Sequence, residues 1–153
     1  MRALELKVPP PAVALLIGAA MWFVSRQPPY LELSPLVRLV AFVVIALVGG
    51  AVALAGDLEF KRARTTINPF KPESSTALVT SGIYRFTRNP MYVGLTLVLL
   101  GWAAFLVSAW ALLGPVGFVL YIGRFQIEPE ERALSAKFGA AYKEYTARVR
   151  RWL

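Results

Sequence analysis

Residues 36–56 read LVRLVAFVVIALVGGAVALAG, an apolar run interrupted by a single charged side chain, Arg38. A helix rises about 1.5 Å per residue, so roughly 20 residues cross about 30 Å of hydrocarbon. The run is therefore long enough to span a membrane. Three further apolar stretches, at 8–24, 90–107 and 109–123, are candidate membrane helices, although the first and the last are short.

The composition of the whole chain supports a membrane location and limits the chemistry. Of its 153 residues 57% are apolar, more than soluble domains usually contain. The chain has no cysteine and no histidine, which excludes disulfides, thiolate nucleophiles, metal sites built from these residues and imidazole acid–base catalysis. We expect no metal site, so any chemistry must use carboxylates, Arg, Lys, Tyr, amides or the backbone.

The basic residues predict the topology. All of the 17 lysines and arginines except Arg26 and Arg38 fall on one side of a four-pass arrangement. The positive-inside rule then places both termini and the 57–89 loop in the cytoplasm, and we expect a multi-pass protein of a prokaryotic inner membrane. The net charge of +8 follows from this topology and does not indicate nucleic acid, because no basic module interleaved with aromatics stands apart from the apolar segments.

These patterns predict an all-α integral membrane protein with about four short transmembrane helices, a cytoplasmic loop and a C-terminal interfacial helix. Residues 1–56 would form an N-terminal helix pair. Residues 57–153 would form a core of loop, helical hairpin and amphipathic helix within the same structural domain. The loop has the Ser, Pro and Gly content of ordered turns, and the near absence of polar residues around Ser108 predicts a tight hairpin with Phe105 and Trp110 as interfacial anchors.

The segment from Glu128 onward has helical spacing. One stripe is apolar and aromatic, and it consists of Leu134, Phe138, Tyr142, Tyr145 and Val149. We expect this amphipathic helix to lie along the membrane interface.

Two constellations are candidates for a site. The first is TSGIYRFTRNPMYVG at 80–94, which has the signals of a helix start, with Asn89 as N-cap and Pro90 as the first helical residue. Alternatively, the same helix start, with its neighbouring arginines, is suited to bind a carboxylate or a phosphate. The second is EPEER at 128–132, which again reads as a helix start with acids in its first turn, or as an acidic cluster that pairs with a cationic ligand near the apolar boundary.

Several motifs, taken in order, resemble the isoprenylcysteine carboxyl methyltransferase family and its phospholipid N-methyltransferase relatives. They are LVTSGIY at 78–84, RNPMYVG at 88–94, Glu130-Glu131, and Phe138-Gly139 followed by Tyr142, Tyr145, Arg148 and Val149. The resemblance covers about residues 68–152, and the first two helices carry no comparable signature.

The resemblance implies a membrane methyltransferase that uses S-adenosylmethionine as cofactor and takes a lipophilic or lipidated acceptor from the bilayer. It also implies that the last helices and the cytoplasmic loop enclose the cofactor pocket. By the family pattern the cofactor-binding residues are Thr76, Ala77, Leu78, Val79, Tyr84, Asn89, Pro90, Met91, Tyr92 and Glu130, with Glu130 holding the methionine part. Asn89 stands where many members have His, and Gln126 stands where eukaryotic members have a basic residue before the acidic pair.

The candidate catalytic residues are Arg88, Arg124 and Glu131. Either arginine can replace the missing basic residue in recognising an acceptor carboxylate, and Glu131 is a possible base for an amine acceptor. Since the cofactor carries an activated methyl group, positioning of donor and acceptor can provide most of the catalysis without a nucleophile or a metal.

Other functions stay open at this point. A membrane reductase of the sterol-reductase type, using a reduced nicotinamide dinucleotide, shares this architecture, and a non-enzymatic scaffold subunit is favoured if the acids and arginines pair only with each other. Within the methyltransferase interpretation the acceptor is a prenylated carboxylate or thiol, a phospholipid amine or another hydrophobic molecule. The sequence does not indicate the oligomeric state.

Overall fold

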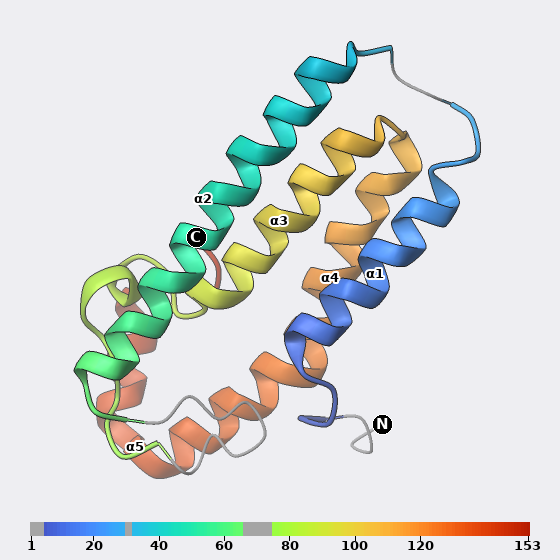
Figure 1. Ribbon diagram of the computed structural model, residues 1–153. Coiled ribbons are helices and arrows are strands. Elements are labelled where there is room, and N and C mark those ends of the chain that lie inside the picture. Colours follow the sequence, from blue (N-terminus) through green and yellow to red (C-terminus); the bar gives the residue numbers. More distant parts are fainter. Residues whose placement is uncertain (1–4, 30–31, 66–74) are drawn as a thin grey trace.

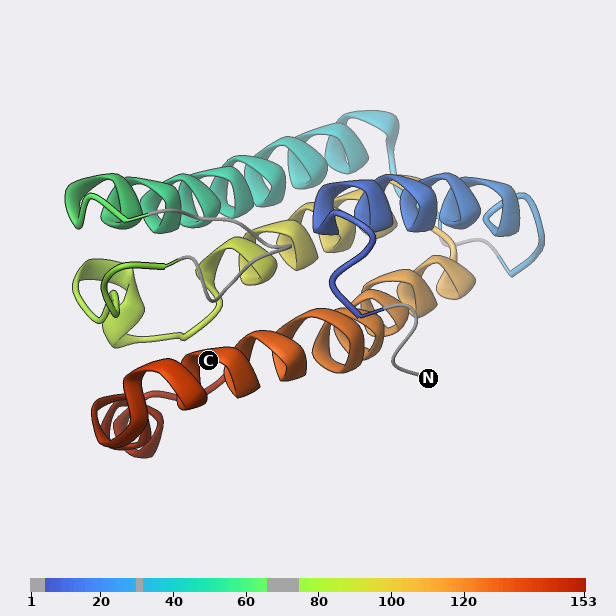
Figure 2. The same cartoon turned by 90° about the horizontal axis from the view of Figure 1, so that it is seen from below.

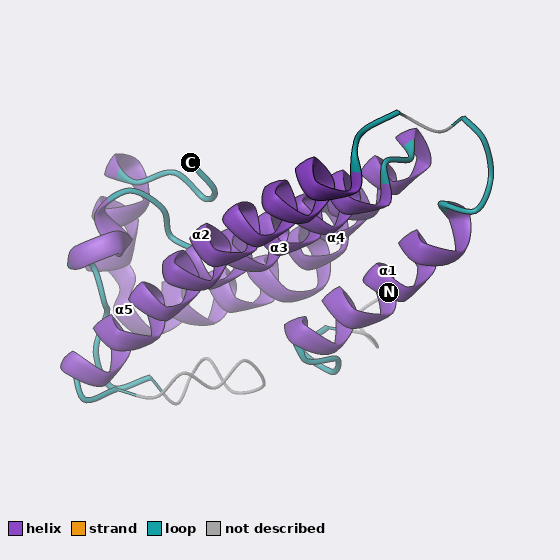
Figure 3. Ribbon diagram, turned by 45° about the horizontal axis from the view of Figure 1, so that its top comes forward, coloured by secondary structure: helices purple, strands orange, loops and turns teal. Residues whose placement is uncertain are grey.

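The structure, a computed structural model, describes residues 5–29, 32–65 and 75–153. Four apolar helices run along one another (Figure 1): α1 (Pro10–Val24), α2 (Pro35–Arg62), α3 (Pro90–Leu106) and α4 (Leu113–Ile122). The short helices η3 (Gly82–Arg85) and η4 (Ala109–Leu112) precede α3 and α4, and the π-helical turn η5 (Gly123–Ile127) joins α4 to α5 (Glu128–Arg148). Every regular segment in the described residues is helical (Figure 3), which confirms the all-α prediction.

The starts of α1, α2 and α3 agree with their local signals, whereas α4 begins at Leu113, four residues after the start of the predicted apolar stretch. Pro10 and Pro90 occupy the first turns of α1 and α3, and the Ser34 hydroxyl accepts a hydrogen bond from the Val37 N–H at the start of α2. The end of α2 differs from the prediction, because the helix continues through Asp57 to Arg62. An ion pair between Lys61 and Asp57, four residues apart at 2.5 Å, supports these extra turns.

Gly49 of α2 and Gly94 of α3 mark a very close approach between these two helices. A Cβ atom at Gly94 would collide with the Gly49 carbonyl oxygen and lie 2.8 Å from the Cβ of Ala53. Small residues let helix backbones approach closely, as is common inside membranes, where dispersion contacts drive helix association. The α2–α3 contact therefore fixes the position of the start of α3, where the second predicted motif begins.

The outer face of α2 is apolar and exposed. Leu36 and Leu47 are 69% and 68% exposed, and their exposed neighbours on α2 are also large and hydrophobic. Exposed apolar surface of this extent is costly in water and favourable in lipid. Two helical segments, Pro35–Arg62 and the continuous Ala109–Arg148, are long and apolar enough to cross a membrane, whereas α1 and α3 are shorter apolar helices.

The two ends of the helical layer differ in character. The connection from α1 to α2 and the hairpin between α3 and α4 lie at the upper end in Figure 1, whereas α5 and the 75–89 segment lie at the lower end. At the upper end, Val107 adopts a left-handed backbone conformation and closes the predicted tight hairpin. The Arg38 guanidinium caps this end of α3 by donating to the Phe105 carbonyl oxygen at 2.7 Å.

α5 begins at Glu128 with Pro129 and the acids in its first turn, as the helix-start interpretation predicts, but no turn or loop separates it from the preceding helix. The chain passes from α4 through η5 into α5 without a break. Pro129 has no N–H to donate to the carbonyl four residues earlier. That carbonyl, on Phe125, instead accepts from the N–H of Leu6 at 3.0 Å. The wide π-helical turn and the bond from the N-terminal segment together let the helix continue past the proline.

α5 is not a single straight helix along the bundle. Gly139 has φ 51° and ψ −119°, a conformation that residues with a Cβ rarely adopt, and it bends the helix sharply. The bend turns the last helical turns back toward the rest of the molecule (Figure 2). As a result Tyr142, Tyr145 and Val149 are buried and pack with Leu78 of the 75–89 segment. The predicted apolar stripe of α5 therefore packs against the 75–89 segment.

Candidate active site

A cavity of about 310 Å³ lies among the lower ends of α1, α2 and α3, the 75–89 segment and α5. This volume falls within the range of roughly 300–1,000 Å³ that small-molecule sites occupy. Most of its lining is apolar or aromatic, with a few charged groups. The lining residues are Pro10, Pro11, Phe60, Ser75, Ala77, Leu78, Val79, Tyr84, Arg88, Asn89, Met91, Tyr92, Leu95, Ile127, Glu130, Glu131, Leu134, Tyr142 and Tyr145.

Glu130 is the carboxylate whose charge is not neutralised. Its Oε1 atom accepts from the Tyr92 hydroxyl at 2.7 Å and from the Gln126 amide at 2.6 Å, and both donors are neutral. Among the described residues no lysine or arginine forms an ion pair with it, and Oε2 accepts no hydrogen bond there. A carboxylate in such surroundings favours a cationic partner, because charge near apolar groups is costly unless it is paired.

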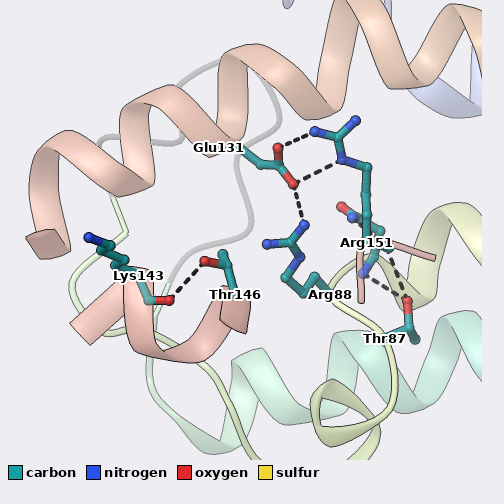
Figure 4. A network of polar contacts seen from close by, with 7 residues as sticks. Thr87, Arg88, Glu131, Lys143, Thr146 and Arg151 are labelled. Atoms are coloured by element: carbon teal, nitrogen blue, oxygen red, sulfur yellow. Dashed lines mark hydrogen bonds and ion pairs between the residues drawn. The ribbon is translucent and has the colours of Figure 1, made fainter. Parts of the chain in front are cut away.

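Glu131, the next residue, is in the opposite situation. Arg151 donates to both of its oxygens, from Nε at 3.1 Å and from Nη2 at 2.6 Å. Arg88 contacts the same carboxylate through Nη2 at 3.0 Å. Two guanidinium groups therefore share one carboxylate (Figure 4). The hydrogen bond to Glu131 raises the pKa of Arg151 above its already high ordinary value, so the network stays charged.

Arg88 retains hydrogen-bonding capacity that the protein does not use. Its Nε atom is buried and has no hydrogen-bond partner among the described residues. A buried donor without a partner costs roughly 1–3 kcal/mol, and a turn of the guanidinium that brings this N–H to an acceptor atom of a ligand would relieve that cost. Arg88 also lines the cavity, where an anionic group of a ligand can reach the guanidinium.

Four tyrosines line the cavity and rigidify it. Tyr92, from the first turn of α3, and Tyr84, from η3, are both buried. The Tyr145 hydroxyl, on the far side of the α5 bend, donates to the Tyr84 carbonyl oxygen at 2.8 Å. Burial raises the pKa of the Tyr84 hydroxyl above its ordinary value, so this group is neutral at physiological pH. Their rings give the cavity aromatic faces of the kind that attract cations.

Most of the predicted site residues lie together at this cavity. Ala77, Leu78, Val79, Tyr84, Arg88, Asn89, Met91, Tyr92, Glu130 and Glu131 all line it. Three do not. Thr76 is exposed and its N–H donates to the Thr65 hydroxyl, Pro90 is buried against Gly56 of α2, and Arg124 pairs with Glu5 and Glu128 at 3.2 and 3.1 Å.

Sequence reasoning missed other residues of the site. Gln126 was considered only as a departure from the family pattern, yet its amide holds Glu130. Arg151 was counted only as a cytoplasmic charge, yet it holds Glu131. Pro10 and Pro11, at the start of α1, form part of the wall. Gln126 and Glu130 are four residues apart, so their contact on one helix face was predictable from the spacing. The contact between Arg151 and Glu131 was not, because it depends on the bend at Gly139.

Comparison with known proteins shows the family. The family model for phospholipid methyltransferases matches residues 36–141. The chain belongs to the phospholipid methyltransferase family. This confirms the resemblance that the motifs predicted, and the matched region extends further toward the N-terminus than those motifs did, since it includes α2.

Individual relatives of this phospholipid methyltransferase family member cover different parts of the chain. An uncharacterized protein of Haemophilus influenzae is 48% identical over 63 residues, which are 41% of this chain and all of that protein. Protein-S-isoprenylcysteine O-methyltransferase A of Arabidopsis thaliana is 29% identical over 69% of this chain. A probable protein-S-isoprenylcysteine O-methyltransferase of Oryza sativa subsp. indica has the same identity and coverage. The chain spans 54% and 56% of these two plant proteins. No solved structure matches.

Proposed function

We propose that this protein transfers a methyl group from S-adenosylmethionine to a hydrophobic acceptor held in the membrane. The observation that carries the proposal is Glu130, whose carboxylate borders the cavity and, within the part of the chain that the structure describes, has two neutral donors on one oxygen and none on the other. An ammonium group fits this vacant oxygen, because it supplies both the positive charge and the hydrogen-bond donors.

The remaining polar groups fit the other end of an amino acid. Arg88 has an unpartnered Nε–H and suits the α-carboxylate of the cofactor's methionine part. The aromatic faces of Tyr84, Tyr92, Tyr142 and Tyr145 suit its sulfonium. When bound, the cofactor supplies an activated methyl group. The contribution of the protein is to orient the acceptor toward that group and to exclude water, which the apolar lining favours.

The acceptor is proposed to be ionised at neutral pH, as a carboxylate or a thiolate is. Once Glu130 is assigned to the cofactor ammonium, the described lining residues offer no further unoccupied base: Glu131 is bound by two guanidinium groups, and the Tyr84 hydroxyl has a raised pKa. An ammonium acceptor would first have to lose a proton to such a base, whereas a carboxylate or thiolate needs none. The apolar wall formed by Pro10, Met91 and Leu95 suits the lipophilic part of the acceptor.

We also propose the four-pass topology, with the cavity on the cytoplasmic side. The short helix α3 packs along α2, and α1 packs against α3 and α4, so that all four helices run in the same general direction. The cavity lies at the end of this bundle that carries α5, and most lysines and arginines of the sequence belong to that side in the four-pass arrangement. Reporter fusions after Ser34 and after Leu153 are expected to report opposite sides of the membrane. Both reporters on one side would contradict the topology.

Calorimetry of the purified protein in detergent tests the proposed cofactor. S-adenosylmethionine should bind with a Kd in the micromolar to high-micromolar range, roughly −8 to −5.5 kcal/mol, whereas reduced nicotinamide dinucleotides should give no comparable heat. Incubation with methyl-labelled cofactor and a membrane-lipid extract should then label a lipophilic product. Binding of the nicotinamide dinucleotide in place of S-adenosylmethionine would replace the proposal with the reductase, and binding of neither would remove the enzymatic interpretation.

A further inference from the structure

Arg151 contacts the site in two separate ways. Its side chain binds both oxygens of Glu131. Its backbone carbonyl accepts from the Asn89 amide at 2.8 Å, and from the Thr87 hydroxyl at 3.4 Å. Figure 4 shows the segment lying across the turn that carries Arg88, and the N–H of Arg88 donates to the carbonyl of Arg150 at 3.0 Å. The segment that follows α5 is thus part of the site.

The two guanidinium groups compete for one carboxylate. Arginine and a carboxylate pair best when two parallel N–H groups meet the two oxygens. Arg151 takes both oxygens of Glu131 in this way, which leaves Arg88 with a single contact to Oε1. Without Arg151, Arg88 would be free to turn and occupy Oε2 as well. Its Nε–H would then be used by Glu131 and no longer be available to a ligand.

We infer that Arg151 is a positioning residue which, by occupying Glu131, keeps the Arg88 guanidinium available for the carboxylate of an amino-acid-type ligand. This inference rests on the proposed function, since it takes that ligand to be S-adenosylmethionine. It assigns Arg151 no contact with the ligand. It means that recognition of the ligand carboxylate depends on Arg151, a residue that follows the bend of α5.

A comparison of two ligands tests this role. S-adenosylmethionine and its decarboxylated form differ in the carboxylate and share the ammonium, the sulfonium and the adenosine. The unaltered protein should bind the carboxylated form more tightly by roughly tenfold to a hundredfold, as one charge-assisted hydrogen bond provides. In Arg151→Ala this preference should fall to about threefold or less, with the affinity for the decarboxylated form unchanged. Arg151→Lys should lie between, because an ammonium cannot bind both oxygens in the same plane.

Arg150→Ala is the matched control, because Arg150 is adjacent, carries the same charge and has an exposed side chain. It should keep the full preference. Equal losses for both ligands in Arg151→Ala would mean a merely structural role and would overturn the inference, as would a preference that survives the substitution. If the unaltered protein binds both ligands equally well, the inference fails while the proposed function stands. If it binds neither, both fail.

Discussion

Replacement of Glu130 by glutamine is the substitution that most directly tests the site. Among the described residues, both hydrogen bonds to this carboxylate go to Oε1, from Tyr92 and Gln126. A glutamine can keep its oxygen at this position and accept from the same two donors. Its NH₂ group then occupies the place of Oε2. The substitution therefore removes one negative charge and puts a donor where an ammonium needs an acceptor, with little change in shape.

The size of the effect follows from this exchange. A hydrogen bond to a charged group contributes about 1.5 to 3 kcal/mol, which corresponds to roughly a tenfold to hundredfold increase in the Kd of S-adenosylmethionine. The fold should not suffer, because an uncompensated carboxylate among apolar groups costs free energy that the amide does not. We expect the thermal stability in detergent to be unchanged or slightly higher.

The measurement is a binding isotherm for S-adenosylmethionine, with Glu128→Gln as the control. Glu128 lies on the same turn, is 41% exposed in its side chain and pairs with Arg124 at 3.1 Å, away from the cavity lining. Its substitution should change the Kd by less than about threefold, in keeping with the small contribution of exposed ion pairs. Normal binding by Glu130→Gln at matched thermal stability would refute the ammonium assignment.

Two glycine substitutions test the fold that supports the site. Gly94→Ala should destabilise the protein by roughly 1–3 kcal/mol or more, because its Cβ would meet the backbone of Gly49. Gly50→Ala is the control and should not destabilise the protein, because a Cβ there meets nothing within 4 Å. Equal melting temperatures for the two variants would contradict the α2–α3 contact. Gly139→Ala should lower the free energy of unfolding by about 1–3 kcal/mol, because residue 139 has a positive φ, and it should weaken cofactor binding through loss of the bend. Gly123→Ala is the control, since Gly123 has φ −54° and open space around it. Unchanged stability and cofactor binding in Gly139→Ala would mean that the bend is not needed.

The helices were predictable from sequence because each is an apolar run with a clear beginning. Ser34 and the prolines at 10, 35 and 90 mark starts that agree with helix-capping rules. The clustering of Arg88 with the acidic pair was predictable only through the family resemblance. Without the resemblance, the local pattern of the 80–94 and 128–132 segments fitted two ordinary helix starts equally well.

What the sequence did not reveal depends on contacts between distant residues. Pro129 lies in the first turn of α5 as its local pattern predicts. The unbroken passage from α4 into α5 was not predictable, because it depends on Leu6 satisfying the carbonyl that the proline leaves without a donor. The bend at Gly139 is equally hidden, since a glycine within an amphipathic stripe fits a straight helix as well. The position of Arg151 beside Glu131 follows from that bend.

The bond between Leu6 and Phe125 has a consequence for the order of folding. Glu5, the neighbour of Leu6, also pairs with Arg124, 119 residues away along the chain. Contacts between such distant segments form late, because closing a long loop costs entropy before the contact stabilises anything. During synthesis the first residues must wait until residue 125 has emerged. The joint between α4 and α5, and with it the cavity wall that includes Ile127 and Glu130, is therefore expected to be completed late.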